Sequence, residues 1–171
     1  MIAWLYFVLG FFPAMLVHEM GHVGVGWLEG HRDPVIRFGS PWQRVLATVR
    51  CGPVVLQFHA SPAFLVTPPS YHFARPAGDS ALAELVRAAA GPAASAILFL
   101  LATPDVQQGI RDLLHFSFAV NSFRSAVAFW GAIGALLPLI PMTYRSPRVS
   151  SDGLTVVRSL SRLLRERSKT A

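Results

Sequence analysis

Apolar residues dominate three stretches of this chain, and polar segments separate them. No charged side chain occurs in residues 1–17 or in residues 88–104, and a third uncharged stretch covers residues 125–144. A helix needs about 20 consecutive apolar residues to cross a bilayer. The pattern therefore predicts three transmembrane helices, over about 2–28, 81–103 and 113–141.

Residues 29–80 have a different pattern. Short runs rich in Val, Phe and Leu alternate with Gly-Ser-Pro, Gly-Pro and Ser-Pro sequences, which are typical of turns. The runs cover residues 35–38, 45–50, 54–58 and 63–66. We expect one or two β-hairpins here, lying against the membrane face.

The C-terminal part, residues 142–167, reads as a polar loop followed by a short helix. Apolar side chains such as Leu154, Val157 and Leu160 share one helical face, and Arg158 and Arg162 face away from it. This pattern is typical of an amphipathic helix at the membrane interface. All 171 residues fit a single, mainly α-helical membrane domain.

Composition favours a membrane partner over a nucleic acid. Only 14% of the residues are charged, against roughly 25% in soluble domains. The net charge is +6, but the basic residues gather at the ends of apolar runs and in the C-terminal tail. An anionic lipid surface explains this distribution. Cys51 is the single cysteine, which excludes an internal disulfide and a cysteine zinc site.

The distribution of basic residues also predicts an orientation in the membrane. Residues 29–80 contain five Arg and residues 142–171 contain seven Lys or Arg, whereas residues 104–112 contain one. Basic loops tend to stay in the cytosol, so we expect the N-terminus outside and the C-terminus inside. The first apolar segment lacks a basic start and a small-residue cleavage site, and we interpret it as a retained helix of a multi-pass protein.

A metal-binding motif ends the first apolar segment. His18-Glu19-Met20-Gly21-His22 places two imidazoles one helical turn apart, where both can bind one ion. Glu19 is offset around the helix and is close enough to activate water without being a ligand. Ionisable groups at membrane depth indicate a functional site, and this spacing indicates a zinc hydrolase.

A catalytic zinc site normally has three protein ligands, and the motif supplies two. Leu28 occupies the position at which metzincins have a third histidine. Asp152 follows the last expected span, precedes a glycine and belongs to the expected cytosolic side. The other candidates for the third ligand are Glu29, His31, Asp33, His59, His72 and His115.

Three motifs together resemble the site-2 protease family of intramembrane zinc metallopeptidases. They are the His18–His22 motif in the first span, Gly91-Pro92 in the second, and Asp152-Gly153 after a proline-rich stretch at 136–141. The resemblance implies one zinc ion bound by His18, His22 and Asp152, with Glu19 as general base. It also implies cleavage of a membrane-spanning protein near the cytosolic face, with Gly91, Pro92 and Ser95 contributing to substrate binding.

The chain departs from that family in three places. Many members have Asn at the positions of Ser95 and Ala135, and the stretch from the prolines to the aspartate, 142–151, is longer here. The Asn positions are thought to hold the substrate backbone, and the longer stretch gives Asp152 room to move away. These departures motivate an alternative, a catalytically silent relative that binds or sequesters membrane helices. A metal-handling membrane protein is a further alternative.

Each motif also has a purely structural interpretation. Gly91-Pro92 can serve as a kink with close helix packing, and Asp152 can serve as the cap of the last helix. Under the peptidase interpretation, a locally unwound substrate pairs with residues 35–38 as an added strand. We expect such an enzyme in a bacterial plasma membrane, with a transmembrane substrate, no nucleic acid and a regulatory membrane partner.

Overall fold

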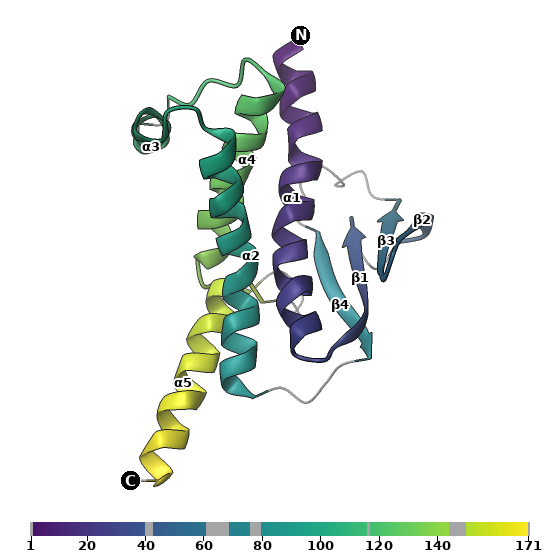
Figure 1. Ribbon diagram of the computed structural model, residues 1–171, viewed down its shortest axis with the longest axis vertical. Helices are drawn as coiled ribbons and strands as arrows, with labels where there is room; N and C mark the ends of the chain where they lie inside the picture. The colour runs from purple at the N-terminus through teal and green to yellow at the C-terminus, as the bar shows by residue number, and fades with distance from the viewer. Residues whose placement is uncertain are drawn as a thin grey trace.

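Three helices pack side by side in the computed structural model of the chain, and a small sheet lies beside the first of them (Figure 1). The structure describes residues 2–39, 43–60, 69–75, 80–115, 117–143 and 150–170. The three packed helices are α1 (Ile2–Leu28), α2 (Ala81–Ala102) and α4 (Phe123–Leu136).

Shorter elements connect this bundle and extend it. Along the chain, helix α3 (Val106–Leu114) follows α2 and precedes α4, and the 3₁₀ turn η1 (Leu137–Leu139) follows α4. Helix α5 (Asp152–Thr170) packs along α2 and runs to the end of the molecule opposite the N-terminus (Figure 1). The predicted C-terminal helix after the proline-rich stretch is confirmed by α5.

Small residues allow the helices to approach closely. Gly10 of α1 faces Ala126 of α4, and Gly131 of α4 faces the backbone of Phe99 in α2. A Cβ atom at either glycine would lie 3.0 Å from a backbone atom of the neighbouring helix. Small residues at such contacts are typical of helix packing in membranes, where van der Waals contact replaces the hydrophobic effect.

Helices α1 and α2 are long and apolar enough to cross a membrane, with 27 and 22 residues. Their bounds match the first two expected spans. The single helix expected over residues 113–141 is wrong, because α3 ends at Leu114 and α4 starts only at Phe123. Helix α4 and η1 together form a shorter apolar segment, Phe123–Leu139.

The start of α4 has a clear local cause. The hydroxyl of Ser122 accepts a hydrogen bond from the backbone N–H of Ser125 (3.1 Å), and the Ser125 hydroxyl accepts one from the N–H of Ser122 (2.9 Å). This reciprocal arrangement is a capping box, which satisfies two N–H groups that a helix start leaves unpaired. A new helix therefore begins here, where the polar residues Asn121 and Arg124 interrupt the apolar pattern of the third expected span.

The segment after α1 forms one four-stranded mixed sheet in the order β2–β3–β1–β4. Strands β2 (Val45–Cys51) and β3 (Val54–His59) form the expected hairpin, around a turn in which Gly52 has a φ of +60°. Strand β1 (Arg32–Phe38) pairs in parallel with β3 and antiparallel with β4 (Ser70–Arg75). The hairpin prediction was therefore incomplete, and β4 was not predicted. The expected run at 63–66 lies outside the described residues.

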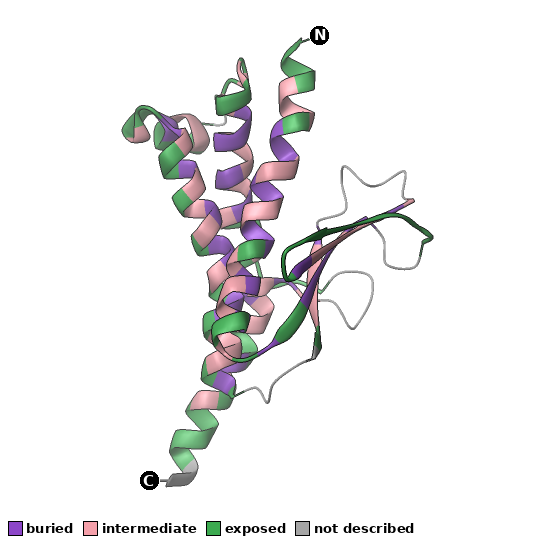
Figure 2. Ribbon diagram, turned by 45° about the vertical axis from the view of Figure 1, so that its right-hand side comes forward, coloured by how far each residue is buried: buried purple, intermediate pink, exposed green. Residues whose placement is uncertain are grey.

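One face of the sheet packs against the second half of α1. Ile36 and Phe38 of β1 and Val54 of β3 form a core with Val23 of α1, to which Phe12 adds a ring contact. The edge strand β2 is exposed along its whole length (Figure 2). The sheet thus reaches the part of α1 that carries the histidine motif.

Candidate metal centre

Two imidazoles and a carboxylate from opposite ends of the chain converge between α1 and α5. Nε2 of His18 lies 3.2 Å from Nε2 of His22 and 3.2 Å from Oδ2 of Asp152, and Nε2 of His22 lies 3.4 Å from the same oxygen. Ligand atoms 2.0–2.1 Å from a tetrahedral zinc ion are separated by about 3.3 Å. The three atoms therefore have the spacing of three corners of a zinc coordination tetrahedron.

The outer nitrogen of each imidazole has its own partner. Nδ1 of His18 lies 3.0 Å from the hydroxyl of Ser95, and Nδ1 of His22 donates to the backbone carbonyl of Arg87 at 2.7 Å. A carbonyl can only accept, so Nδ1 of His22 carries a proton and the lone pair of the neutral ring is on Nε2. Metal-binding histidines are usually oriented in this way by their second nitrogen.

His22 is also enclosed on its faces. The ring of Tyr71 in β4 stacks on it, with centroids 4.6 Å apart and an interplanar angle of 19°. On the side of α2, a Cβ atom at Gly91 would overlap the His22 ring. His22 is 1% exposed, and the sheet and α2 together set its orientation.

The first turn of α5 brings in Asp152. Capping of this helix is performed by the preceding residue, since the Ser151 hydroxyl accepts the N–H of Leu154 at 3.2 Å. The capping role considered for Asp152 is therefore filled by Ser151, and the Asp152 carboxylate turns to the imidazoles. Burial raises the pKa of Asp152, but the neighbouring imidazoles of His18 and His22 outweigh this effect and hold the pKa below its usual value.

The base of the loop before Asp152 is closed by hydrogen bonds. The Ser151 hydroxyl donates to the carbonyl of Ile140 (2.8 Å) and accepts the N–H of Met142 (3.0 Å), while the Ser151 N–H donates to the Met142 carbonyl (3.0 Å). Residues 144–149 lie outside the described part. The proline-rich stretch therefore holds the start of α5 in place, and the distance of Asp152 from the imidazoles does not depend on the length of the loop.

Glu19 lies beside the three ligands without being one of them. It is 4% exposed and interacts electrostatically with both His22 and Asp152. Its place on α1, one residue after His18, offsets it from the line that joins the two imidazoles. The structure thus leaves Glu19 available as an acid or base.

Gly91, Pro92 and Ser95 all lie on the buried side of α2. Gly91 makes room for the His22 ring, and Ser95 is 0% exposed with its hydroxyl on His18. Pro92 lies within the helix, as the structural interpretation of Gly91-Pro92 expected. Substrate binding by these three residues stays a prediction, and the contacts of Gly91 and Ser95 are with His22 and His18.

The other candidates for the third ligand lie elsewhere. Glu29 and His31 bind Arg87, and His72 binds Arg37. Nδ1 of His59 donates to the backbone carbonyl of Gln43. His115 follows α3, and Asp33 is in β1 with a positive φ of 54°. Within the described ranges, the group with metal-binding geometry is His18, His22 and Asp152.

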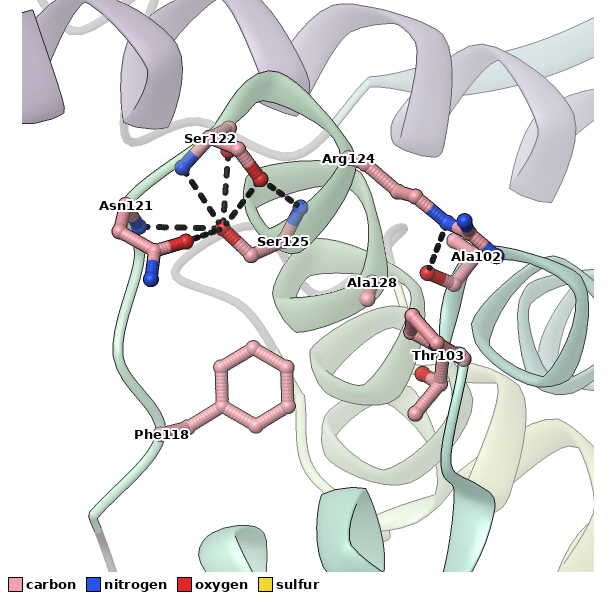
Figure 3. Close-up of a pocket in the computed structure, with 9 residues that line it drawn as sticks. Ala102, Thr103, Phe118, Asn121, Ser122, Arg124, Ser125 and Ala128 are labelled. Atoms are coloured by element: carbon pink, nitrogen blue, oxygen red, sulfur yellow. Dashed lines mark hydrogen bonds between the residues drawn. The ribbon is translucent and has the colours of Figure 1, made fainter.

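A hollow of about 230 Å³ lies where α2 ends and α4 begins (Figure 3). The guanidinium of Arg124 donates to the carbonyl of Ala102 at 2.9 Å, and Ser122 and Ser125 cap α4. These groups serve the helix ends. The hydroxyl of Thr103 is buried without a partner among the described residues. Among the described residues, the group with metal-binding geometry lies elsewhere, at His18, His22 and Asp152.

Sequence reasoning missed two contributors to this centre, Tyr71 and Arg87. Tyr71 belongs to the strand that was not predicted, although Tyr71 and Phe73 alternate with polar residues as in a half-buried strand. Arg87 is the last charged residue before the long uncharged stretch of α2. A charge at this position could have indicated that Arg87 contributes to the site.

Comparisons of the chain with models of protein families, with curated proteins and with solved structures found no match.

Proposed function

We propose that this protein is an intramembrane zinc endopeptidase that hydrolyses a peptide bond of a membrane-spanning protein near the cytosolic face. The observation that carries this proposal is the spacing of the three ligand atoms, at 3.2, 3.2 and 3.4 Å in a buried site. Arrangements of two histidines and one carboxylate with an open fourth position are typical of catalytic zinc.

The donor set fits one zinc ion. Two imidazole nitrogens and one carboxylate oxygen are ordinary zinc ligands, and a closed structural site would need a fourth. Among the described residues, the cluster contains three ligands and no more. The partners on the outer nitrogens, Ser95 and the Arg87 carbonyl, give the second layer of hydrogen bonds that such sites use.

The roles of the residues follow from their positions. When bound, zinc supplies a Lewis acid that polarises the scissile carbonyl and acidifies water. The Glu19 carboxylate takes the proton of the attacking water and passes it to the departing amine. His18, His22 and Asp152 hold the ion. A binding protein would have no need of a carboxylate at Glu19, and this favours the enzyme over the silent relative.

We place α1, α2 and α4 across the membrane, with the shorter α4 extended by η1. The strongly basic segments, the sheet region and α5, lie away from the end that holds the N-terminus and α3 (Figure 1). This arrangement supports an N-terminus outside and a C-terminus in the cytosol. The metal centre then lies in the cytosolic half of the molecule.

The expected pairing of an unwound substrate with residues 35–38 does not fit the sheet, and we assign this pairing to strand β4 instead. These residues lie in β1, which has neighbours on both sides and cannot pair with another strand. Strand β4 is at the edge of the sheet, and its Tyr71 stacks on His22. An unwound substrate stretch that pairs with the free edge of β4 would lie beside the metal centre.

The central experiment compares the purified protein with its Glu19→Gln and Asp152→Asn variants. Bound zinc is measured in each, and each is co-expressed with a panel of tagged single-span membrane proteins whose fragments are detected by immunoblot. We expect zinc in the native protein and in Glu19→Gln, less in Asp152→Asn, and cleavage with the native protein alone.

Two outcomes contradict the proposal. Absence of zinc from the native protein removes the metal centre altogether. Equal zinc in the native protein and in Glu19→Gln, with capture of single-span proteins and no cleavage by either, favours the helix-binding alternative.

A further inference from the structure

A buried ionic cluster lies next to the metal centre, at the end of α1. The guanidinium of Arg87 on α2 donates to the carboxylate of Glu29 (2.5 Å) and to Nε2 of His31 (2.5 Å). Arg87 is 7% exposed and His31 is 2% exposed. Glu29 and His31 belong to the turn between α1 and β1, so the cluster fastens α2 to the beginning of the sheet.

The same arginine contacts the metal centre through its backbone. The carbonyl of Arg87 accepts the Nδ1–H of His22 at 2.7 Å. Its side chain also interacts electrostatically with Tyr71, whose ring stacks on the His22 imidazole. Arg87 is therefore in contact with His22 through its backbone and is coupled to a second neighbour of that ring.

A buried guanidinium allows little displacement. Removing it from its charged and polar partners would leave a charge in a dry interior, which is strongly unfavourable. Its planar group with several donors also fixes direction, in a way that a lysine ammonium cannot. The carbonyl of Arg87 belongs to the turn of α2 that this guanidinium anchors to Glu29 and His31, so the anchoring limits movement of the carbonyl relative to α1.

We propose that Arg87 is a positioning residue of the metal centre, whose guanidinium, bound by Glu29 and His31, fixes the carbonyl that orients His22. The inference rests on the metal binding in the proposed function. It assigns the buried cluster a role in the affinity of the site for zinc and goes beyond the three ligands and Glu19.

The test measures metal affinity and site geometry without an activity assay. Co²⁺ replaces Zn²⁺ and reports tetrahedral coordination by its visible absorption, and zinc affinity is obtained by competition with a chelator. The variants are Arg87→Met, Arg87→Lys and Glu29→Gln in the full-length purified protein. The matched control is Arg162→Met. Arg162 is an exposed arginine of α5 whose guanidinium donates to the carboxylate of Glu84, on the helix α2 that also carries Arg87.

We expect Arg87→Met to weaken zinc binding by up to about 10-fold, the lower end of the loss seen when an outer hydrogen-bond partner is removed, because the carbonyl remains but the turn that carries it is no longer anchored. We also expect an altered Co²⁺ spectrum. Arg87→Lys restores part of the affinity because it keeps the charge, and Glu29→Gln weakens binding less than Arg87→Met. Arg162→Met binds like the native protein.

The outcomes separate this inference from the proposed function. Native protein that binds no zinc contradicts the proposed function itself. Native affinity and an unchanged Co²⁺ spectrum in folded Arg87→Met contradict only the positioning role. If Arg87→Met fails to fold, Glu29→Gln decides, and native affinity and spectrum in that variant overturn the inference.

Discussion

The hydroxyl of Ser95 on α2 lies 3.0 Å from Nδ1 of His18 on α1, 77 residues earlier in the chain. Ser95 is completely buried, and a Cβ atom at Gly134 of α4 would lie 2.8 Å from the same hydroxyl. The three packed helices thus meet around one hydrogen bond that orients a proposed metal ligand. In this chain, a small serine occupies a position with no room for a larger amide.

Replacing Ser95 with Ala should weaken zinc binding by roughly 10-fold, the lower end of the loss expected for an outer partner of a metal-binding histidine. Ring rotation of His18 is then restrained only by packing. Chelator competition on the purified protein measures the change. The control is Ser161→Ala on α5, whose hydroxyl bonds only the Val157 carbonyl of its own helix. Equal losses in both variants would argue against a specific role for Ser95.

Replacing Gly91 with Ala should abolish tight zinc binding, by about 100-fold or more. The added methyl group would overlap the imidazole of His22 and push its ligand nitrogen away. Gly24→Ala in α1 is the matched control, because a Cβ atom there meets nothing within 4 Å. Alanine is also favoured over glycine in a helix by about 1 kcal/mol. Zinc binding by Gly91→Ala at the native level would show that α2 does not approach His22 as closely as described.

Removing zinc with a chelator should lower the thermal stability of the native protein and leave Asp152→Asn nearly unchanged. A ligand that binds only the folded state stabilises it by about 4 kcal/mol when its concentration is 1,000 times Kd. The loss of this term appears as a fall in Tm, measured in detergent with and without added zinc. An identical fall in Asp152→Asn would assign the effect to another site.

Acidification should loosen the sheet through His72. Burial, and then the nearby positive charge of Arg37, lower the pKa of His72 from its usual value of 6.5. The unfolded sheet therefore binds a proton before the folded one, and the stabilising contribution is complete above about pH 6.5 and declines as the pH falls. Limited proteolysis of the sheet at pH 7.5 and pH 5 measures this.

The control for His72 is His72→Gln, which keeps an acceptor for Arg37 but does not titrate. We expect the proteolysis rate of this variant to change less between the two pH values than that of the native protein. A pH response of the same size in both proteins would assign the loosening to another group.

Much of the site was accessible from the sequence because it depends on local periodicity. His18 and His22 lie four residues apart in an apolar segment, so their common helical face follows from the geometry of the helix alone. The spans of α1 and α2 and the existence of α5 follow from similar short-range patterns. Asp152 could be named only as the most suitable of several candidates, because no local pattern connects it to a residue 134 positions earlier.

The break between α3 and α4 is also local, since a capping box at Ser122 starts a new helix next to the polar residues Asn121 and Arg124. The tertiary structure alone decided the contacts between elements. The pairing of β1 with β4 and the contacts of Ser95 and Arg87 with the histidines join residues 33 to 77 positions apart. Periodicity along a chain shows which face of an element is apolar. Which residue of another element meets that face is decided by how all the elements pack together.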